Sequence, residues 1–137
     1  MKIYFSGSIR AGRADVSFYA EIIRLLKEHG TVLTEHIGDQ ALTDQGEPGL
    51  TEEFIYERDM GWLRAADALV AEVTHPSLGV GYEVAQAEHL NKKVLCLYRP
   101  QTERKVSGMI KGNRKMRVHP YQTMEEVRKI LAEFFGT

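Results

Sequence analysis

Residues 68–98, ALVAEVTHPSLGVGYEVAQAEHLNKKVLCLY, predict a strand, a helix and a second strand in direct succession. Segments 68–73 and 93–98 are short apolar runs, as expected of strands buried on both faces. Residues 79–90 form a longer run with the spacing of a helix. A unit of this kind joins parallel neighbours in one sheet, so the stretch predicts an α/β fold.

The same alternation extends over the rest of the chain and predicts five strands in all. The remaining strands are expected at residues 2–6, 31–34 and 115–119. The remaining helices are expected at residues 16–29 with Gly30 as a stop, at 51–66, and at 124–135 behind a Thr123 cap. We therefore expect residues 1–137 to form a single three-layer, doubly wound domain, with a five-stranded parallel sheet of flavodoxin-like order 2-1-3-4-5.

Length, composition and charge narrow the class of protein. The chain has 137 residues, of which 43% are hydrophobic and 27% charged, and its net charge is −1. This balance is typical of one globular domain, and the near-zero charge argues against a general nucleic-acid binder. Neither a secretory signal nor the apolar run of about 18 residues that a membrane span needs is found. We expect a cytoplasmic protein.

The single cysteine and the scattered histidines argue against a metal site. Cys96 lies in an apolar run, so a disulfide framework and a thiolate zinc cluster are both excluded within one chain. The histidines show no pair at helical spacing; they stand at positions 29, 36, 75, 89 and 119. We expect neither a metal nor a cofactor.

Two loops rich in glycine and hydroxyl residues follow the first and third predicted strands, where this strand order places a ligand site. They are residues 6–13, SGSIRAGR, and residues 74–81, THPSLGVG. Both offer backbone N–H groups near a helix start, which suits phosphate, and Arg10 or Arg13 could add a charged donor. Glycine–serine loops also serve simply to turn a chain, so both interpretations stay open.

Three residues near these loops suggest chemistry on a glycosidic bond. Glu83 falls in the first turn of the predicted helix, where the helix dipole favours an ionised carboxylate suited to a nucleophile. Such a bond is commonly broken by two carboxyl groups, and Asp59 is the candidate partner, with Tyr4 beside them. The alternatives are that Glu83 only stabilises its helix, that Asp59 is a solvated helix residue and that Tyr4 is an ordinary strand aromatic.

Four blocks of the sequence together resemble the 2'-deoxynucleoside 5'-monophosphate N-glycosidases of the nucleoside 2-deoxyribosyltransferase superfamily. In chain order they are YFSGSIRAGR from Tyr4, GTVLTEH from Gly30, RDMGWLRAADALVAEVTHPSLGVGYE from Arg58 and VLCLYRPQ from Val94. They span about residues 3–112 with compatible spacing, which makes the resemblance stronger than any single motif.

The resemblance implies a role for each matching residue. Glu83 matches the nucleophile that forms a covalent deoxyribosyl intermediate, Asp59 the carboxyl group that assists departure of the base, and Tyr4 a tyrosine beside the sugar. This is the retaining route, for which the two carboxyl groups are expected roughly 5 Å apart. The other matching positions are expected to bind substrate: Ser8, Arg10, Ser77 and Gly79 around the 5'-phosphate, Ile9 and Gly12 in the same loop as Ser8, and His36, a strand-end residue, at the base.

The resemblance also implies a homodimer. Relatives complete the phosphate pocket with a serine of the neighbouring subunit, and Ser107 in VSGMI is the matching position, followed by Met109 among the substrate-binding residues. The loops at 38–49 and 99–114 are long enough to act as lids or ligand-binding segments, and the first does not align with the family.

Several related activities remain open at this point. A nucleoside deoxyribosyltransferase would pass the sugar to a second base instead of water, and a close cousin would hydrolyse ribonucleotides such as cytidine monophosphate. A non-catalytic nucleotide sensor is the alternative from another class, although retention of both Glu83 and Asp59 counts against it. The sequence leaves the preferred base undetermined.

Overall fold

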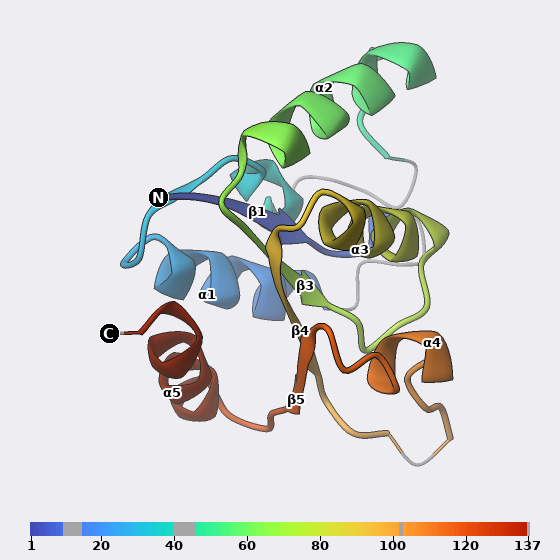
Figure 1. Ribbon diagram of the computed structural model, residues 1–137. Coiled ribbons are helices and arrows are strands. Elements are labelled where there is room, and N and C mark those ends of the chain that lie inside the picture. The colour runs from blue at the N-terminus through green and yellow to red at the C-terminus, as the bar shows by residue number, and fades with distance from the viewer. Residues whose placement is uncertain (10–14, 40–45, 102, 137) are drawn as a thin grey trace.

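The computed structural model describes residues 1–9, 15–39, 46–101 and 103–136 and shows the expected parallel sheet (Figure 1). Its five strands lie in the order β2-β1-β3-β4-β5, and every neighbouring pair is parallel. They are β1 (Lys2–Ser6), β2 (Thr31–Val32), β3 (Ala68–Glu72), β4 (Lys93–Tyr98) and β5 (Arg117–Pro120). The predicted fold class and strand order are therefore confirmed.

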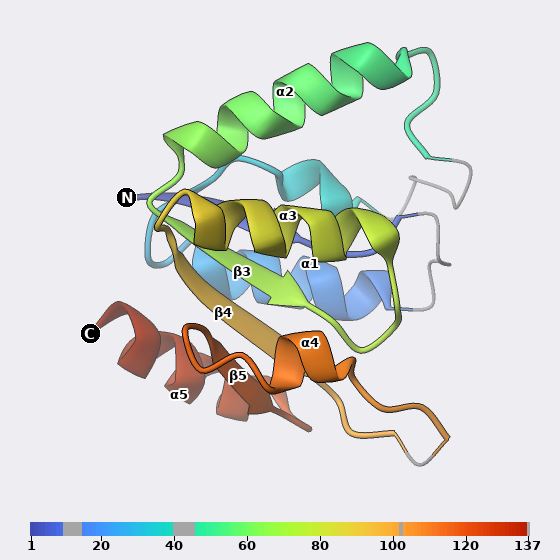
Figure 2. The same cartoon turned by 45° about the vertical axis from the view of Figure 1, so that its right-hand side comes forward.

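Helices cover both faces of the sheet, as the two views show (Figures 1 and 2). One face carries α1 (Val16–Leu26) and α5 (Met124–Phe135), and the other carries α2 (Glu52–Ala65) and α3 (Leu78–His89). Helices α2, α3 and α5 each begin behind a hydroxyl cap: Thr51, Ser77 and Thr123 respectively accept hydrogen bonds from backbone N–H groups in the first turn. Among the described residues, no helix combines the length and the apolar character needed to cross a bilayer.

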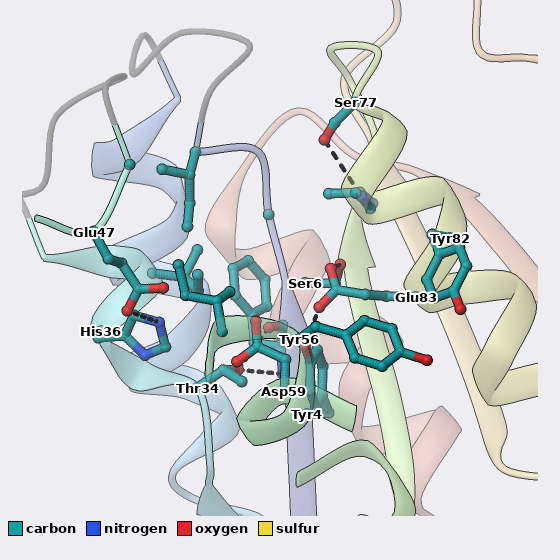
Figure 3. Close-up of a pocket in the computed structure, with 18 of the residues that line it drawn as sticks. Tyr4, Ser6, Thr34, His36, Glu47, Tyr56, Asp59, Ser77, Tyr82 and Glu83 are labelled. Carbon is teal, nitrogen blue, oxygen red and sulfur yellow. Dashed lines mark hydrogen bonds and ion pairs between the residues drawn. The ribbon is translucent and has the colours of Figure 1, made fainter. Parts of the chain in front are cut away.

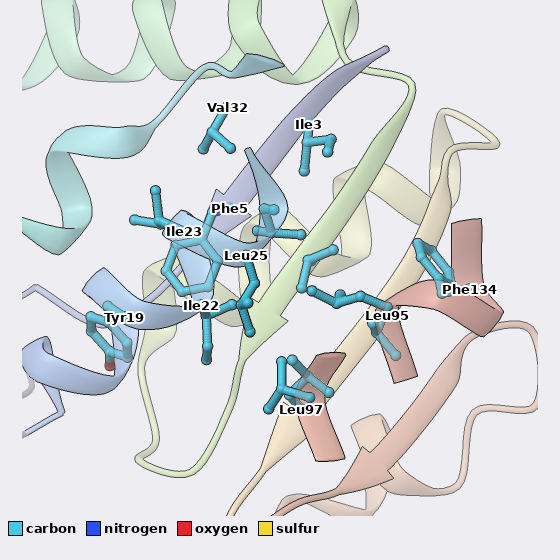
Figure 4. Packing of buried hydrophobic residues seen from close by; sticks show 14 of the residues in the cluster. Ile3, Phe5, Tyr19, Ile22, Ile23, Leu25, Val32, Leu95, Leu97 and Phe134 are labelled. Carbon is cyan, nitrogen blue, oxygen red and sulfur yellow. The ribbon is translucent and has the colours of Figure 1, made fainter. Parts of the chain in front are cut away.

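Alternating side chains of β1 divide the core into two layers. Ile3 and Phe5 pack with α1 and α5 in the cluster of Figure 4, whereas Tyr4 packs with the α2 and α3 cluster. All three side chains are at most 1% exposed. Because successive strand residues point to opposite faces, the strand that supplies core residues to one layer turns Tyr4 into the other.

The second strand is shorter than the predicted 31–34 because a side chain takes over its pairing. Thr34 Oγ1 accepts from Phe5 N at 2.9 Å and donates to Phe5 O at 2.6 Å, which occupies the edge of β1 where a longer β2 would bond. The chain then turns into a short 3-10 helix, η1 (Glu35–Gly38), that the sequence pattern did not predict. This turn brings residues 34–37 to the carboxyl end of β1.

Two other boundaries differ from the prediction. Helix α1 ends at Leu26 rather than at 29, and Gly30 lies against the first residue of the chain. A Cβ at Gly30 would stand 2.3 Å from the Met1 carbonyl oxygen, so this glycine is required by close packing. A second short helix, α4 (Gly108–Lys111), interrupts the predicted 99–114 loop.

Candidate active site

A pocket of about 380 Å³ opens at the carboxyl ends of β1 and β3, where the strand order reverses direction. Its walls come from β1, η1, the segment at residues 46–47, α2 and α3 (Figure 3). Tyr4, Asp59 and Glu83, separated by up to 79 positions in sequence, all line it. The fold thus brings together the three residues expected to act on the substrate.

Glu83 is held by two hydroxyl groups from β1. Tyr4 Oη donates to Oε2, and Ser6 Oγ donates to Oε1 at 2.9 Å. Burial raises the pKa of Glu83 to about 7, although the hydrogen bonds from Tyr4 and Ser6 oppose the rise; the charge of Asp59 adds to it. Near neutral pH this carboxylate therefore exists in both protonation states, and its ionised form is accessible without a neighbouring cation.

The predicted position of Glu83 in the first helical turn is wrong. Ser77 is the N-cap and Leu78 the first helical residue, so Glu83 lies in the second turn, beyond the reach of most of the dipole effect. The expected cause of ionisation is therefore corrected: burial, the largest influence, raises the pKa and opposes ionisation, and the two hydroxyl donors, rather than the helix terminus, stabilise the charge.

Tyr4 serves as a permanent hydrogen-bond donor. It is 1% exposed, and burial together with the charge of Glu83 raises the pKa of its phenol far above the ordinary value. The hydroxyl consequently keeps its proton at any pH at which the protein is folded, and that proton points at the Glu83 carboxylate.

Asp59 is partly buried and already has one partner. Its Oδ1 accepts from Arg58 Nε at 2.9 Å, and 26% of the side chain is exposed. Burial raises the pKa of Asp59, and the hydrogen bond and charge of Arg58 oppose that rise. The residue is thus not a freely solvated helix side chain, and its electrostatic coupling to Glu83 places both carboxyl groups on one pocket. Their separation of roughly 5 Å stays a prediction.

His36 lines the pocket as expected, and a carboxylate holds it there. Its Nε2 lies 3.2 Å from Glu47 Oε1, and its ring lies 5.8 Å from that of Trp62. Glu47 in turn receives two hydrogen bonds from Arg58, at 2.9 and 2.7 Å. In Figure 3, His36 and Glu47 lie on one side of the pocket and Glu83 on the other, with Asp59 between them in this view.

The residues expected to bind substrate from the two glycine-rich loops divide into three groups. Ile9, Ser77 and Gly79 line the pocket. Ser8 is buried beside it, and its backbone N–H donates to Tyr19 Oη at 3.1 Å. Arg10, Gly12 and Arg13 lie outside the described residues, so their expected contacts with substrate stay predictions.

Ser107 and Met109 lie apart from this pocket. They line a second cavity of about 880 Å³ on the outer side of α3, whose walls also include Ser77 and Leu78. Ser107 caps α4 by accepting from Met109 N at 3.2 Å, and Met109 is 84% exposed. Neither residue lines the pocket of the carboxylates within one chain, which is compatible with the expected action across a subunit interface.

Sequence reasoning missed three residues of the site: Ser6, Glu47 and Arg58. Both Ser6 and Arg58 stand inside the quoted blocks. Ser6 lies two positions after Tyr4 in the predicted strand, so strand alternation, which places both side chains on one face, is the signal that could have found it. Arg58 is adjacent to Asp59, but no spacing shows that its side chain turns toward its neighbour. Glu47 belongs to the loop that did not align. Among the described residues, no group of three or more metal-ligating side chains converges.

An α/β fold with two carboxyl groups in one pocket fits the class of enzymes that break a glycosidic bond. The family model "Nucleoside 2-deoxyribosyltransferase" matches residues 3–130, and the chain belongs to this family. A Danio rerio protein named 5-hydroxymethyl-dUMP N-hydrolase is 46% identical over 140 residues, covering 100% of this chain and 97% of its own. The Mus musculus protein of the same name is 48% identical over 137 residues, covering 97% and 79%.

Solved structures agree on the fold. The CMP N-glycosidase of Clostridium botulinum superposes with a TM-score of 0.69 at 16% identity, covering 98% of this chain and 99% of its own. A 2-deoxyribosyltransferase from Bacillus psychrosaccharolyticus gives 0.66 at 18% identity, with coverage of 93% and 90%. The comparisons confirm the family and the class of enzyme, a hydrolase of N-glycosyl compounds, that the sequence blocks predicted.

Proposed function

We propose that this enzyme hydrolyses the N-glycosidic bond of a 2'-deoxynucleoside 5'-monophosphate to a free base and 2-deoxyribose 5-phosphate. The observation that carries the proposal is the Glu83 carboxylate, held by Tyr4 and Ser6 in the pocket that Asp59 also lines. The relatives named 5-hydroxymethyl-dUMP N-hydrolase support a phosphorylated deoxynucleoside as the substrate.

The reaction proceeds in two steps through a glycosyl-enzyme. A Glu83 oxygen attacks C1' of the sugar; the C1'–N bond breaks as the C1'–O bond forms, and Asp59 supplies the proton for the departing base. A water molecule then attacks C1', gives its proton to Asp59 and releases Glu83. Burial raises the pKa of Asp59, which favours the protonated form that the first step requires of it.

We propose a pyrimidine as the base, on the strength of the relatives' names. In the pocket the side opposite Glu83 offers an imidazole and a carboxylate, His36 and Glu47, which can exchange hydrogen bonds with the polar edge of a base or with a hydroxymethyl group. The 5'-phosphate would lie at the other end, near Ser77 and the start of α3.

The test is chromatography of the base released from a panel of deoxynucleoside monophosphates, including 5-hydroxymethyl-dUMP, with their ribo counterparts and the unphosphorylated nucleosides. Release confined to deoxynucleoside monophosphates supports the proposal. Transfer of deoxyribose to an added free base would establish the transferase instead, and binding without release from any substrate would favour a sensor.

We further propose a homodimer in which Ser107 and Met109 of one subunit complete the phosphate pocket of the other. The exposed apolar side chains beside the second cavity, Leu78 at 96% and Met109 at 84%, support a covered surface here. Mixing Glu83→Gln with Ser107→Ala subunits should restore activity, because mixed dimers contain one intact site. A Glu83→Gln and Asp59→Asn mixture is the matched control and should stay inactive. A monomeric mass by light scattering would refute the dimer.

A reducing compartment fits the free and buried Cys96, and we propose the cytoplasm.

A further inference from the structure

Arg58 bonds the proposed acid directly, and three contacts fix the position of its guanidinium. Its Nε donates to Asp59 Oδ1 at 2.9 Å, while Nη1 and Nη2 donate to the two oxygens of Glu47 at 2.9 and 2.7 Å. Its side chain is 18% exposed and that of Glu47 only 12%. A bidentate pair of this burial is more rigid than an ion pair on an open surface.

Helix geometry alone would not produce the contact between Arg58 and Asp59. Adjacent residues on a helix point in different directions, so the side chain has to be bent toward its neighbour. The guanidinium lies between two aromatic rings of the same helix, four residues away on either side: its carbon is 4.7 Å from the Trp62 centroid and 5.9 Å from that of Phe54. These rings and Glu47 hold the guanidinium where Nε reaches Asp59.

We infer that Arg58, held by Glu47, is a positioning residue that engages Oδ1 of Asp59 and so makes Oδ2 the oxygen that carries the proton to the departing base. The inference rests on the proposed function, since it concerns how Asp59 performs its part. The physical reason is that an oxygen accepting a charged N–H bond is the less basic of the two, so a proton on this carboxyl group resides on the other oxygen.

The same contact sets how readily Asp59 is protonated. Charged and titratable groups face Asp59 from every side: Arg58 on its own helix, Glu47 before it, His36 on η1, and Glu83 and Tyr4 across the pocket. Burial and the charge of Glu47 raise the pKa of Asp59, whereas Arg58 and His36 lower it. Arg58 and Glu47 therefore act on the Asp59 titration in opposite directions, although they are partners in one ion pair.

The changes expected in the pKa of Asp59 have opposite signs in the Arg58 and Glu47 variants, and this distinguishes a positioning role from a merely structural ion pair. If the Glu47–Arg58 pair stabilised the fold without acting on Asp59, removing either partner would lower stability and leave both the Asp59 titration and kcat of the folded protein unchanged. If Arg58 sets the state of Asp59, Arg58→Gln raises the pKa of Asp59, because a charge-assisted donor is lost. Glu47→Gln lowers it, because a nearby negative charge disappears while Arg58 remains.

The experiment measures both activity and titration in Arg58→Gln, Arg58→Lys and Glu47→Gln. Carboxyl carbon NMR of the free protein, with the Asp59 signal assigned through Asp59→Asn, follows the titration without any need for substrate. Arg64→Gln, a change at an exposed arginine of the same helix, is the matched control. Circular dichroism and thermal melts establish that each variant is folded.

Arg58→Gln should lower kcat by roughly 10²-fold with a much smaller change in KM, since it misplaces the acid rather than removing a substrate contact. Its Asp59 titration and the basic limb of its pH profile should move to higher pH, and those of Glu47→Gln to lower pH. Arg58→Lys should restore the titration more than the rate, because an ammonium group supplies the charge without the fixed Nε donor.

An Asp59 titration that stays at the wild-type midpoint in a folded Arg58 variant would overturn the inference, as would wild-type kcat in Arg58→Gln. If Arg58→Gln does not fold, Arg58→Lys and Glu47→Gln decide the question by the same two measurements. A wild-type protein that releases no base would contradict the proposed function instead, and the titration arm would still report on Arg58.

Discussion

Two glutamates around β3 each accept a hydrogen bond from a tyrosine, yet their surroundings differ. Glu72, the last residue of β3, bonds Tyr121 Oη at 2.5 Å, and Glu83 on α3 bonds Tyr4 Oη. Glu72 also accepts from Thr74 N at 2.7 Å and from Thr74 Oγ1 at 2.8 Å, and Arg99 Nε lies 3.6 Å away. Its side chain is entirely buried. Glu72 is thus fully satisfied and inaccessible.

Glu83 has hydroxyl partners only. Tyr4 and Ser6 donate to it, no ion pair to it exists among the described residues, and its carboxylate borders the open pocket. Hydroxyl donors orient a carboxylate without neutralising its charge, so it can still attack an electron-poor carbon. A backbone N–H and a nearby guanidinium, by contrast, make the Glu72 charge a fixed part of the fold. The difference lies in the partners rather than in the glutamate itself.

The largest expected difference between the two glutamates is in catalytic activity. We expect Glu83→Gln to lower base release by roughly 10⁴-fold or more, because the amide cannot form the glycosyl-enzyme. Glu72→Gln should retain kcat when measured on the folded fraction, since its side chain has no access to the pocket. Titrating active sites in both variants makes the rates comparable. Substantial turnover by Glu83→Gln would show that Glu83 is not the nucleophile.

The second expected difference is in stability. Here Glu72→Gln, rather than Glu83→Gln, should show the larger loss. Glu72→Gln removes the carboxylate from a buried network with Tyr121, Thr74 and Arg99, so we expect a loss of about 3–5 kcal/mol, although Arg99 keeps its ion pair with Asp15. Glu83→Gln removes a buried carboxylate that has no cationic partner and should not destabilise the fold at neutral pH. Urea denaturation at pH 7 measures both, with Glu21→Gln on the exposed face of α1 as the control. Equal losses for Glu72 and Glu83 would contradict the distinction.

The strands and helices could be predicted from the sequence because the patterns that indicate them are local. Apolar runs and helical spacing give the five strands and the order of helices around them. The end of β2 was missed because the hydrogen bonds of Thr34 to Phe5 link residues that lie 29 positions apart. No periodicity over a short window contains a contact of that kind.

The site was predictable only in part, for the same reason. Glu83, Asp59 and Tyr4 were identified mainly through resemblance of whole blocks, and the structure brings them together in one pocket. The roles of Ser6 and Arg58 depend on which way a side chain turns, and the raised pKa of Glu83 depends on burial by segments far away in sequence. The helix-terminus argument failed because α3 begins at Leu78, which places Glu83 one turn too far along.

The smallest effect is the pH dependence of stability that Glu83 contributes. Its pKa rises from the ordinary value of 4.5 to about 7 in the folded chain, which corresponds to at most about 3 kcal/mol. Between these values the folded protein binds a proton that the unfolded chain has released, so the contribution of Glu83 is complete below pH 4.5 and is lost as the pH rises through 7.

Relative to wild type, Glu83→Gln should therefore gain stability between pH 4.5 and 7 and keep a constant advantage above it. Urea denaturation of both proteins from about pH 4.5 to about pH 8.5 measures this difference, in which the titrations of groups remote from Glu83 cancel, and Glu21→Gln should show no such slope. A constant difference over the whole range would mean that Tyr4 and Ser6 hold the carboxylate ionised in spite of its burial, and the contrast with Glu72 would then rest on access to the pocket alone.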